Sequence, residues 1–173
     1  MVYILLGTGF EEIEALTPVD LLRRAGVEVK TVGLNGKIVY GSHAIGVEAD
    51  MTIEELDVSD AEMIVLPGGL GGVASIRGCE KALEAVKAVW AAGKYVAAIC
   101  AGPTVLAELG LLTGKKALKN LRTHSTFGNS LYKFLNYLKA NISFKQSEFN
   151  FSHAFLNIGG GQFTFISKSF KRI

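Results

Sequence analysis

Short, nearly unbroken apolar runs alternate with amphipathic stretches over the first 112 residues of the chain. Apolar runs of strand length predict buried strands at 2–6, 62–69 and 94–100. Apolar residues near helical spacing, with glycine stops, predict helices at 11–26, 79–93 and 102–112. The pattern therefore alternates strand and helix.

The helix predicted at 11–26 places Ile13, Leu16 and Val19 among the apolar positions that face the core, and Gly26 ends it. Residues 27–33 then alternate in the manner of a strand. Asn35-Gly36 predicts a hairpin turn that leads into a second extended stretch at 38–40.

Strands that alternate with helices predict a mostly parallel sheet covered by helices on both faces, an open α/β sandwich. A length of 173 residues fits one domain, residues 1–173, and 49% apolar with 20% charged residues is typical of a globular chain. The amino terminus has neither the basic region of a signal peptide nor the length of a membrane span. Two cysteines fit a reducing compartment, so a cytoplasmic protein without membrane contact is expected.

The composition changes abruptly after about Lys116. Residues 1–116 hold 15 of the 16 acidic residues, whereas the last 57 residues hold 9 of the 10 phenylalanines and 8 of the 18 lysines and arginines. Three interpretations stay open: a basic, aromatic binding segment, ordinary secondary structure, or a sequence foreign to the fold through a reading-frame error or gene fusion. Nucleic-acid binding is not favoured, because the basic residues are scattered and no RNA-binding signature is present.

Cys100 lies where the strand at 94–100 meets the helix at 102–112. A nucleophile elbow needs a strand, a sharp turn with small flanking residues and a helix, and Ala98 and Gly102 are small enough. The amino end of the helix would favour a thiolate and lower the thiol pKa. Cys100 can equally be a buried thiol that packs like an apolar side chain.

Two other segments follow the carboxyl ends of predicted strands, GTGFEEIEA after the strand at 2–6 and LPGGLGG at 66–72. Ligands of doubly wound sheets bind at this edge. A carboxyl group of Glu11, Glu12 or Glu14 can exchange a proton with a nearby thiolate, or each can be a solvated acid of the first helical turn. Gly68 and Gly69 can present backbone N–H groups to an oxyanion, or simply form a tight turn.

Several other functions are excluded or disfavoured. Gly7-Thr8-Gly9 is not a dinucleotide site, because Glu12 occupies the position of the third glycine and three carboxylates would repel a pyrophosphate. The three histidines, His43, His124 and His153, lack metal-ligand spacing, so no metal site is expected. Residues 159–163 are interpreted as a flexible turn.

Residues 1–117 resemble the ThiJ/PfpI superfamily, in its DJ-one branch. The matching segments are EEIEALTPVDLLRRAGVEV (11–29), IVLPGGLGG (64–72) and AAICAGPTVLAELGLLTGKK (97–116). The resemblance implies a flavodoxin-like sandwich, a homodimer and no cofactor. It further implies that Cys100 is the nucleophile, that a protonated Glu14 hydrogen-bonds its sulfur, and that Gly68, Gly69 and Ala101 line the oxyanion and substrate pocket.

The departures from the family pattern concern the tail, residues 118–173. The family's histidine follows the cysteine by about twenty residues, but Asn120 stands there and His124 is the nearest candidate. The D-G-N-x-I-T strand and G-P-G helix start are missing, so the strand at 94–100 would lie uncovered unless the tail replaces them.

The function implied is that of a glyoxalase or deglycase, with methylglyoxal or an early adduct on a protein as the substrate. A redox sensor or holdase chaperone without turnover is the alternative, and a pseudoenzyme is a further one. A peptidase is disfavoured, because Ala101 stands where the local cysteine–histidine dyad needs a histidine.

Overall fold

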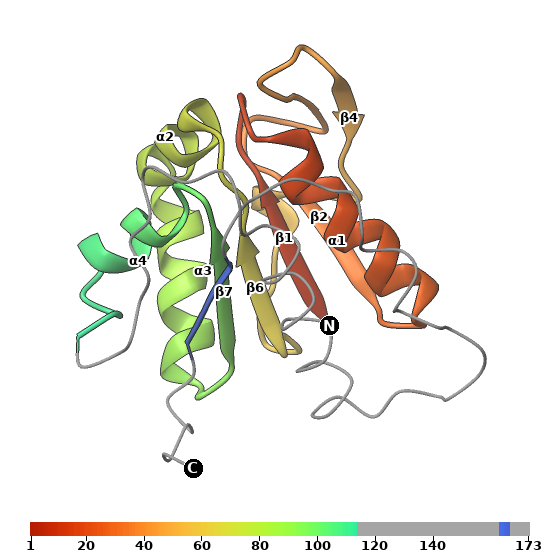
Figure 1. Cartoon of the computed structure of the whole chain (residues 1–173). Coiled ribbons are helices and arrows are strands. Elements are labelled where there is room, and N and C mark those ends of the chain that lie inside the picture. The colour runs from red at the N-terminus through yellow and green to blue at the C-terminus, as the bar shows by residue number, and fades with distance from the viewer. Residues whose placement is uncertain (114–162, 167–173) are drawn as a thin grey trace.

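The structure of the chain is a computed structural model that describes residues 1–113 and 163–166 (Figure 1). In chain order the elements are β1 (Val2–Leu6), α1 (Glu12–Arg24), β2 (Val29–Gly33), β3 (Ile38–Tyr40), β4 (Gly46–Glu48), β5 (Met51–Thr52), the short 3-10 helix η1 (Ile53–Glu55), β6 (Met63–Leu66), α2 (Leu70–Gly78), α3 (Glu80–Ala91), β7 (Tyr95–Ile99), α4 (Pro103–Glu108) and β8 (Phe163–Ile166).

The central sheet has the strand order β5-β2-β1-β6-β7-β8. All its pairs are parallel except β7 with β8. The chain winds from β1 to β2 on one side and then crosses to β6 on the other, so the strand order reverses at β1. This confirms the predicted mostly parallel, doubly wound α/β sandwich. Strands β3 and β4 form a separate antiparallel hairpin.

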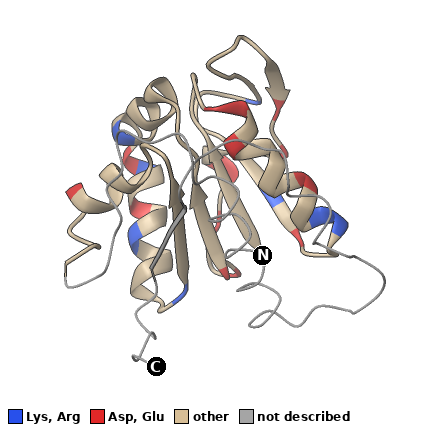
Figure 2. Ribbon diagram, viewed as in Figure 1, with Lys and Arg blue, Asp and Glu red and all other residues tan. Residues whose placement is uncertain are grey.

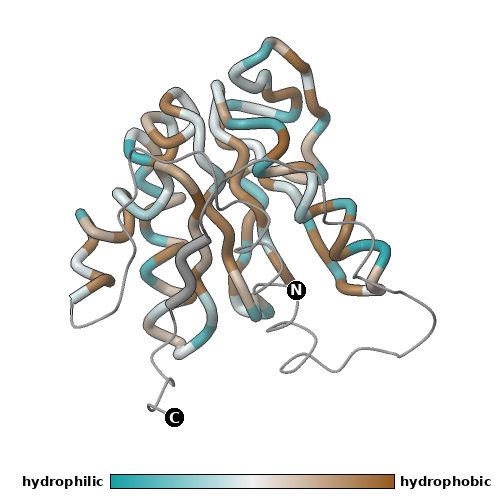
Figure 3. Tube along the Cα trace, viewed as in Figure 1, coloured by the Kyte–Doolittle hydropathy of each residue, from teal (hydrophilic) through white to brown (hydrophobic). Residues whose placement is uncertain are grey.

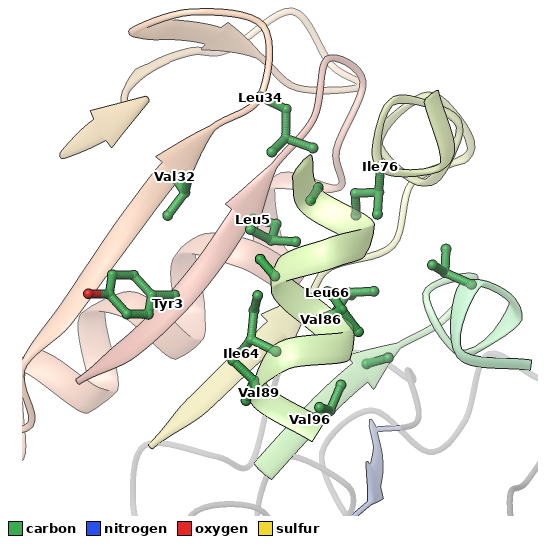
Figure 4. Close-up of a cluster of buried hydrophobic side chains, with 14 of the residues drawn as sticks. Tyr3, Leu5, Val32, Leu34, Ile64, Leu66, Ile76, Val86, Val89 and Val96 are labelled. Atoms are coloured by element: carbon green, nitrogen blue, oxygen red, sulfur yellow. The ribbon is translucent and has the colours of Figure 1, made fainter. Parts of the chain in front are cut away.

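Helices cover both faces of the sheet (Figure 1). Because successive side chains of a strand point to opposite faces, Val2, Ile4 and Leu6 pack on the α1 side, while Tyr3 and Leu5 pack on the side of α2, α3 and α4. Figure 3 shows that the central strands are the most apolar part of the described chain. Figure 4 shows the cluster of buried side chains, Tyr3 and Leu5 among them, that lies between the sheet and α3. The rigid sheet fixes where its strand ends lie.

Helix α1 differs from its sequence-based prediction in the face that it buries. Ile13 is 52% exposed, although its spacing predicted a core position. The buried stripe instead begins at Glu12 and continues through Ala15, Val19 and Leu22 at helical spacing. The acidic first turn thus faces inward, and the prediction for Ile13 is wrong.

Helix α2 was not predicted, because its LGG start is poor in helix-forming residues. The glycines are needed for packing: a Cβ at Gly72 would lie 2.7 Å from the Cα of Phe10, and one at Gly71 would lie 3.0 Å from the Cα of Gly9. Close packing on the loop after β1 therefore outweighs weak helix propensity. Helix α4 is shorter than the predicted 102–112.

Strand β8 lies beside β7, with Phe163 paired to Ile99 and Ile166 to Val96 (Figure 1). The outer edge of β7 is therefore occupied by a strand from the tail, and Phe163 belongs to that strand rather than to the predicted turn. The other tail positions, His124 and His153 among them, lie outside the described residues. Within the described ranges, no helix is long and apolar enough to cross a membrane.

Candidate active site

Cys100 occupies a sharp turn between β7 and α4. Its φ of +57° is in the left-handed region, and in the described chain only Ala44 shares this property among residues other than glycine. Such a conformation costs about 1–2 kcal/mol, so surrounding contacts must hold it. Gly102 permits the turn, because a Cβ there would lie 2.6 Å from the carbonyl oxygen of Leu66. The predicted strand–turn–helix elbow is present.

The elbow presents the thiol rather than burying it. Cys100 is exposed, unlike the preceding residue Ile99, which is fully buried. The backbone N–H groups of Gly69 and Ala101 donate hydrogen bonds to its sulfur, and the carboxyl group of Glu14 is hydrogen-bonded to it. The interpretation of Cys100 as a packed core thiol is therefore wrong.

Glu14 lies in the first turn of α1 and is 8% exposed. The N–H of Gly68 donates to its Oε2 at 2.9 Å. Burial raises the pKa of Glu14 to about 7, an effect reinforced by the charge of Glu11 and opposed by the hydrogen bonds from Cys100 and Gly68. Glu12 is also buried, so neither of these two acids is the solvated first-turn residue that the sequence allowed.

Cys100 and Glu14 titrate as a pair. Although Cys100 is exposed, neighbouring groups partly desolvate its sulfur, which raises the thiol pKa; the charge of Glu14 raises it further, and the N–H donors of Ala101 and Gly69 act in the opposite sense. The expected lowering of the thiol pKa is therefore wrong. Because the two groups are hydrogen-bonded, their protons are lost in two steps that belong to the pair, the first near neutral pH. When Glu14 is protonated, it carries no charge that opposes a thiolate at Cys100.

Gly68 and Gly69 are required by close approach. A Cβ at Gly68 would overlap Oε2 of Glu14 and lie 2.7 Å from the Cβ of Cys100. Gly69 has a φ of +84°, and a Cβ there would lie 2.6 Å from the nitrogen of Glu11. The Gly68 carbonyl accepts the Glu11 N–H at 3.1 Å. These glycines thus join the ends of β1 and β6 around the sulfur.

A second polar cluster lies beside this site and was missed by sequence analysis. Nδ1 of His43 is 2.8 Å from Oε2 of Glu12 and 3.8 Å from Oε1 of Glu11. Ser42 Oγ lies between the two carboxylates, 2.9 Å from Glu11 and 3.1 Å from Glu12. Figure 2 shows acidic positions at the amino end of α1. His43 was judged by its distance in sequence from other histidines, whereas it lies in the loop of the β3–β4 hairpin. The hairpin predicted at Asn35-Gly36 is wrong, because β3 pairs with β4 and not with β2.

Of the residues predicted for the site, the structure brings together Cys100, Glu14, Gly68, Gly69 and Ala101 at the carboxyl ends of β1, β6 and β7. His124 lies outside the described residues. In the described ranges, the one group of three residues with metal-ligand atoms within 4.8 Å is Glu11, Glu12 and His43. These atoms are engaged with one another and with Ser42.

The fold and the site define a doubly wound α/β protein with a cysteine at a nucleophile elbow and a buried carboxyl partner. The chain belongs to the DJ-1/PfpI family, whose model matches residues 1–136. The match extends beyond the expected boundary at residue 117 and includes the position of His124.

Known relatives match most of the same region. Protein dj-1beta of Drosophila melanogaster is 36% identical over 113 residues, 65% of this chain and 60% of the relative. Deglycase PfpI of Pyrococcus furiosus is 35% identical over 107 residues, 62% of this chain and 64% of the relative. Oxidized DJ-1 of Toxoplasma gondii, a solved structure, superposes with a TM-score of 0.63 at 38% identity and covers 68% of this chain and 65% of its own. The chain thus spans somewhat under two thirds of the length of these relatives.

Proposed function

We propose that the protein is a cysteine-dependent, cofactor-free glyoxalase or deglycase that acts on methylglyoxal or on its early adducts with protein side chains. The observation that carries the proposal is the hydrogen bond between Cys100 and the buried carboxyl group of Glu14 at an exposed elbow, with two N–H donors on the sulfur. Relatives named deglycase support the class of activity.

The reaction begins when the Cys100 thiolate attacks the aldehyde carbon of methylglyoxal. A C–S bond forms, the carbonyl oxygen takes the proton of Glu14, and a hemithioacetal results. The Glu14 carboxylate then removes the proton from that carbon and returns it to the neighbouring carbon through an enediol, which gives a lactoyl thioester. Water cleaves the thioester to lactate and the free thiol. The balance is one methylglyoxal and one water to one lactate and one proton, without an external oxidant or reductant.

The test is lactate formation from methylglyoxal by the full chain. We expect activity that is retained in Cys79→Ser, whose thiol lies at the junction of α2 and α3, and lost in Cys100→Ala. Glu14→Gln should also abolish turnover, because the amide cannot take up and return the proton. Activity that survives Cys100→Ala would exclude this mechanism.

A redox sensor or holdase chaperone is the second candidate function. It is favoured by the exposure of Cys100 together with the N–H groups that can stabilise a negatively charged oxidised sulfur. Two molecules of hydrogen peroxide would each transfer one oxygen to the sulfur and leave as water, which gives a sulfinate. The solved Toxoplasma gondii relative is described as oxidized.

Intact mass after peroxide treatment distinguishes the two. Selective gain of two oxygens at Cys100 without lactate formation supports the sensor, and prevention of client aggregation by the oxidised form supports the chaperone. A protein that does neither is a pseudoenzyme. Oxidation of Cys79 in preference to Cys100 would count against sensing at the elbow.

Assembly as a homodimer is also proposed. In the described chain the exposed large apolar residues lie near the amino ends of α1 and α2 and on the β3–β4 hairpin: Ile13, Ile38, Tyr40, Ile45 and Leu70. A second copy of the chain would cover such a surface. Sedimentation should show a dimer that Tyr40→Glu weakens, whereas a monomer in the unaltered protein would exclude this assembly.

A further inference from the structure

Glu12 is a buried acid that the proposed reaction does not use. It is 5% exposed and occupies the first position of the stripe that α1 turns toward the core. A buried carboxylate is costly unless it is well paired, so the hydrogen-bond partners of Glu12 indicate its structural role.

Those partners all come from residues 42–43, in the loop after β3. The backbone N–H of His43 donates to Oε1 of Glu12 at 2.7 Å, while Nδ1 of the same histidine lies 2.8 Å from Oε2. The hydroxyl of Ser42 reaches the same Oε2 at 3.1 Å. Burial acts to raise the pKa of Glu12, but the hydrogen bonds from His43 and Ser42 outweigh it and lower the pKa to about 2.

Glu12 favours the protonated form of His43. Its pKa is raised by the hydrogen bond to Glu12 and by the charges of Glu12 and Glu11. These two acids are the charged groups that face it from α1 in the described chain, and Ser42 is its polar neighbour on the loop. The result is a charge-assisted contact between a helix start and a loop 31 residues further on.

The contact closes a stack of three chain segments. The Tyr40 carbonyl accepts the N–H of Gly9 at 2.8 Å, and the N–H of Ser42 donates to the carbonyl of Phe10 at 2.8 Å. On the other side, the N–H of Glu11 donates to the carbonyl of Gly68. Residues 9–12 therefore lie between the loop 40–43 and the glycine turn 68–69.

The packing of this stack leaves little freedom. A Cβ at Gly41 would overlap the carboxylate of Glu12, and a Cβ at Gly69 would overlap the carbonyl oxygen of Gly9. The loop 40–43 and the glycine turn 68–69 are therefore both in close contact with residues 9–12. Their N–H groups bind Glu14 and the sulfur of Cys100.

We propose that Glu12 and His43 are positioning residues, a clamp that holds the glycine turn 68–69 against the reactive pair of Cys100 and Glu14. Neither residue touches the reacting atoms. The clamp rests on the proposed function only in taking Cys100 and Glu14 as the reactive pair, and its effect is measurable without turnover.

Glu12→Gln separates positioning from charge. Glu12→Gln removes one negative charge and part of what favours protonation of His43, while Glu11 remains 3.8 Å from the ring. Loss of a negative charge near Cys100 and Glu14 would by itself favour ionisation of the pair and speed alkylation. Slower alkylation must therefore come from displaced N–H donors, which disfavours the anionic pair and raises its apparent pKa.

The experiment measures the rate of iodoacetamide alkylation of Cys100 from pH 5 to 10 in the full chain with Cys79→Ser. We expect Glu12→Gln to slow alkylation about tenfold at pH 7, the effect of weakening one hydrogen bond to a charged group. The double variant with His43→Gln should be no slower than Glu12→Gln alone, since both changes remove the same contact. The matched control is Glu54→Gln. It removes an exposed carboxylate of η1 that is paired with Lys81 of α3, and it should leave the rate unchanged.

Amide hydrogen exchange of the peptide that contains Gly68 and Gly69 provides the structural readout, and exchange should be faster in Glu12→Gln. If that variant does not fold, His43→Gln, a change at an exposed side chain, is tested by the same exchange measurement. Unchanged exchange, unchanged or faster alkylation, or additive effects of the two substitutions would overturn the clamp. Absence of lactate formation in the unaltered protein would refute the proposed function but would leave these results intact.

Discussion

Replacement of Glu14 by glutamine should change how the stability of the fold depends on pH. Burial holds the pKa of Glu14 at about 7 in the folded chain, against 4.5 when the group is free. Between these values the unfolded chain releases a proton that the folded chain keeps, so the unaltered protein loses stability as the pH rises from about 4.5 to 7. The difference of 2.5 units corresponds to about 3 kcal/mol at pH 8. Glu14→Gln has no such proton to lose.

The assay is guanidinium unfolding of both proteins between pH 4 and pH 9. The free energy of unfolding of Glu14→Gln relative to the unaltered protein should increase by about 3 kcal/mol across this range and become constant above pH 8. The expectation concerns the first proton of the pair, so it holds whether oxygen or sulfur carries the resulting charge. Two curves that stay parallel from pH 4 to 9 would refute the burial of an ionisable Glu14.

Three further predictions concern the elbow and its surroundings. In a Cys79→Ser background the alkylation rate of Cys100 should rise in two steps, one near pH 7 and one above the ~8.5 of a free thiol, and Glu14→Gln should remove the first step. Cys100→Gly should be more stable than Cys100→Ala by about 1 kcal/mol in chemical unfolding, because glycine adopts a positive φ without strain; equal stability would contradict the strained elbow. Gly68→Ala should cost about 1–3 kcal/mol and slow alkylation, since the new methyl group meets Glu14 and Cys100; a thermal melt and a rate within error of the unaltered protein would argue against that packing.

The sheet strands β1, β2, β6 and β7 could be predicted from sequence because each is a clear apolar or alternating run with a glycine nearby, whereas the short edge strands β5 and β8 were not predicted. Cys100 and Gly68 were found in the same way, since a strand followed by small residues points to a sheet edge. Helix α2 could not be predicted, because its stability depends on how closely its glycines approach Phe10. The burial of Glu12 was equally hidden, since it requires a partner, His43, that is distant in sequence.

The sign of the Cys100 pKa shift also depended on tertiary structure. Sequence placed the thiol at a helix start, which favours the thiolate, whereas burial and the charge of Glu14 act against it. Which effect prevails depends on the distance between the side chain of Glu14 on α1 and that of Cys100 after β7, and no local pattern encodes that distance.

The pairing of β7 with β8 has a consequence for the order in which the molecule folds. The residues of β8 that pair with β7 lie more than 60 residues further along the chain. Strands β1, β2, β6 and β7, by contrast, all lie within the first 99 residues. Closing so long a loop is a late event, both because its entropy cost grows with length and because a ribosome releases β8 well after β7. During synthesis the strand that ends in Cys100 therefore has one open edge after its other neighbour, β6, is in place. A chaperone that shields strand edges would have its greatest effect in this interval, before β8 emerges.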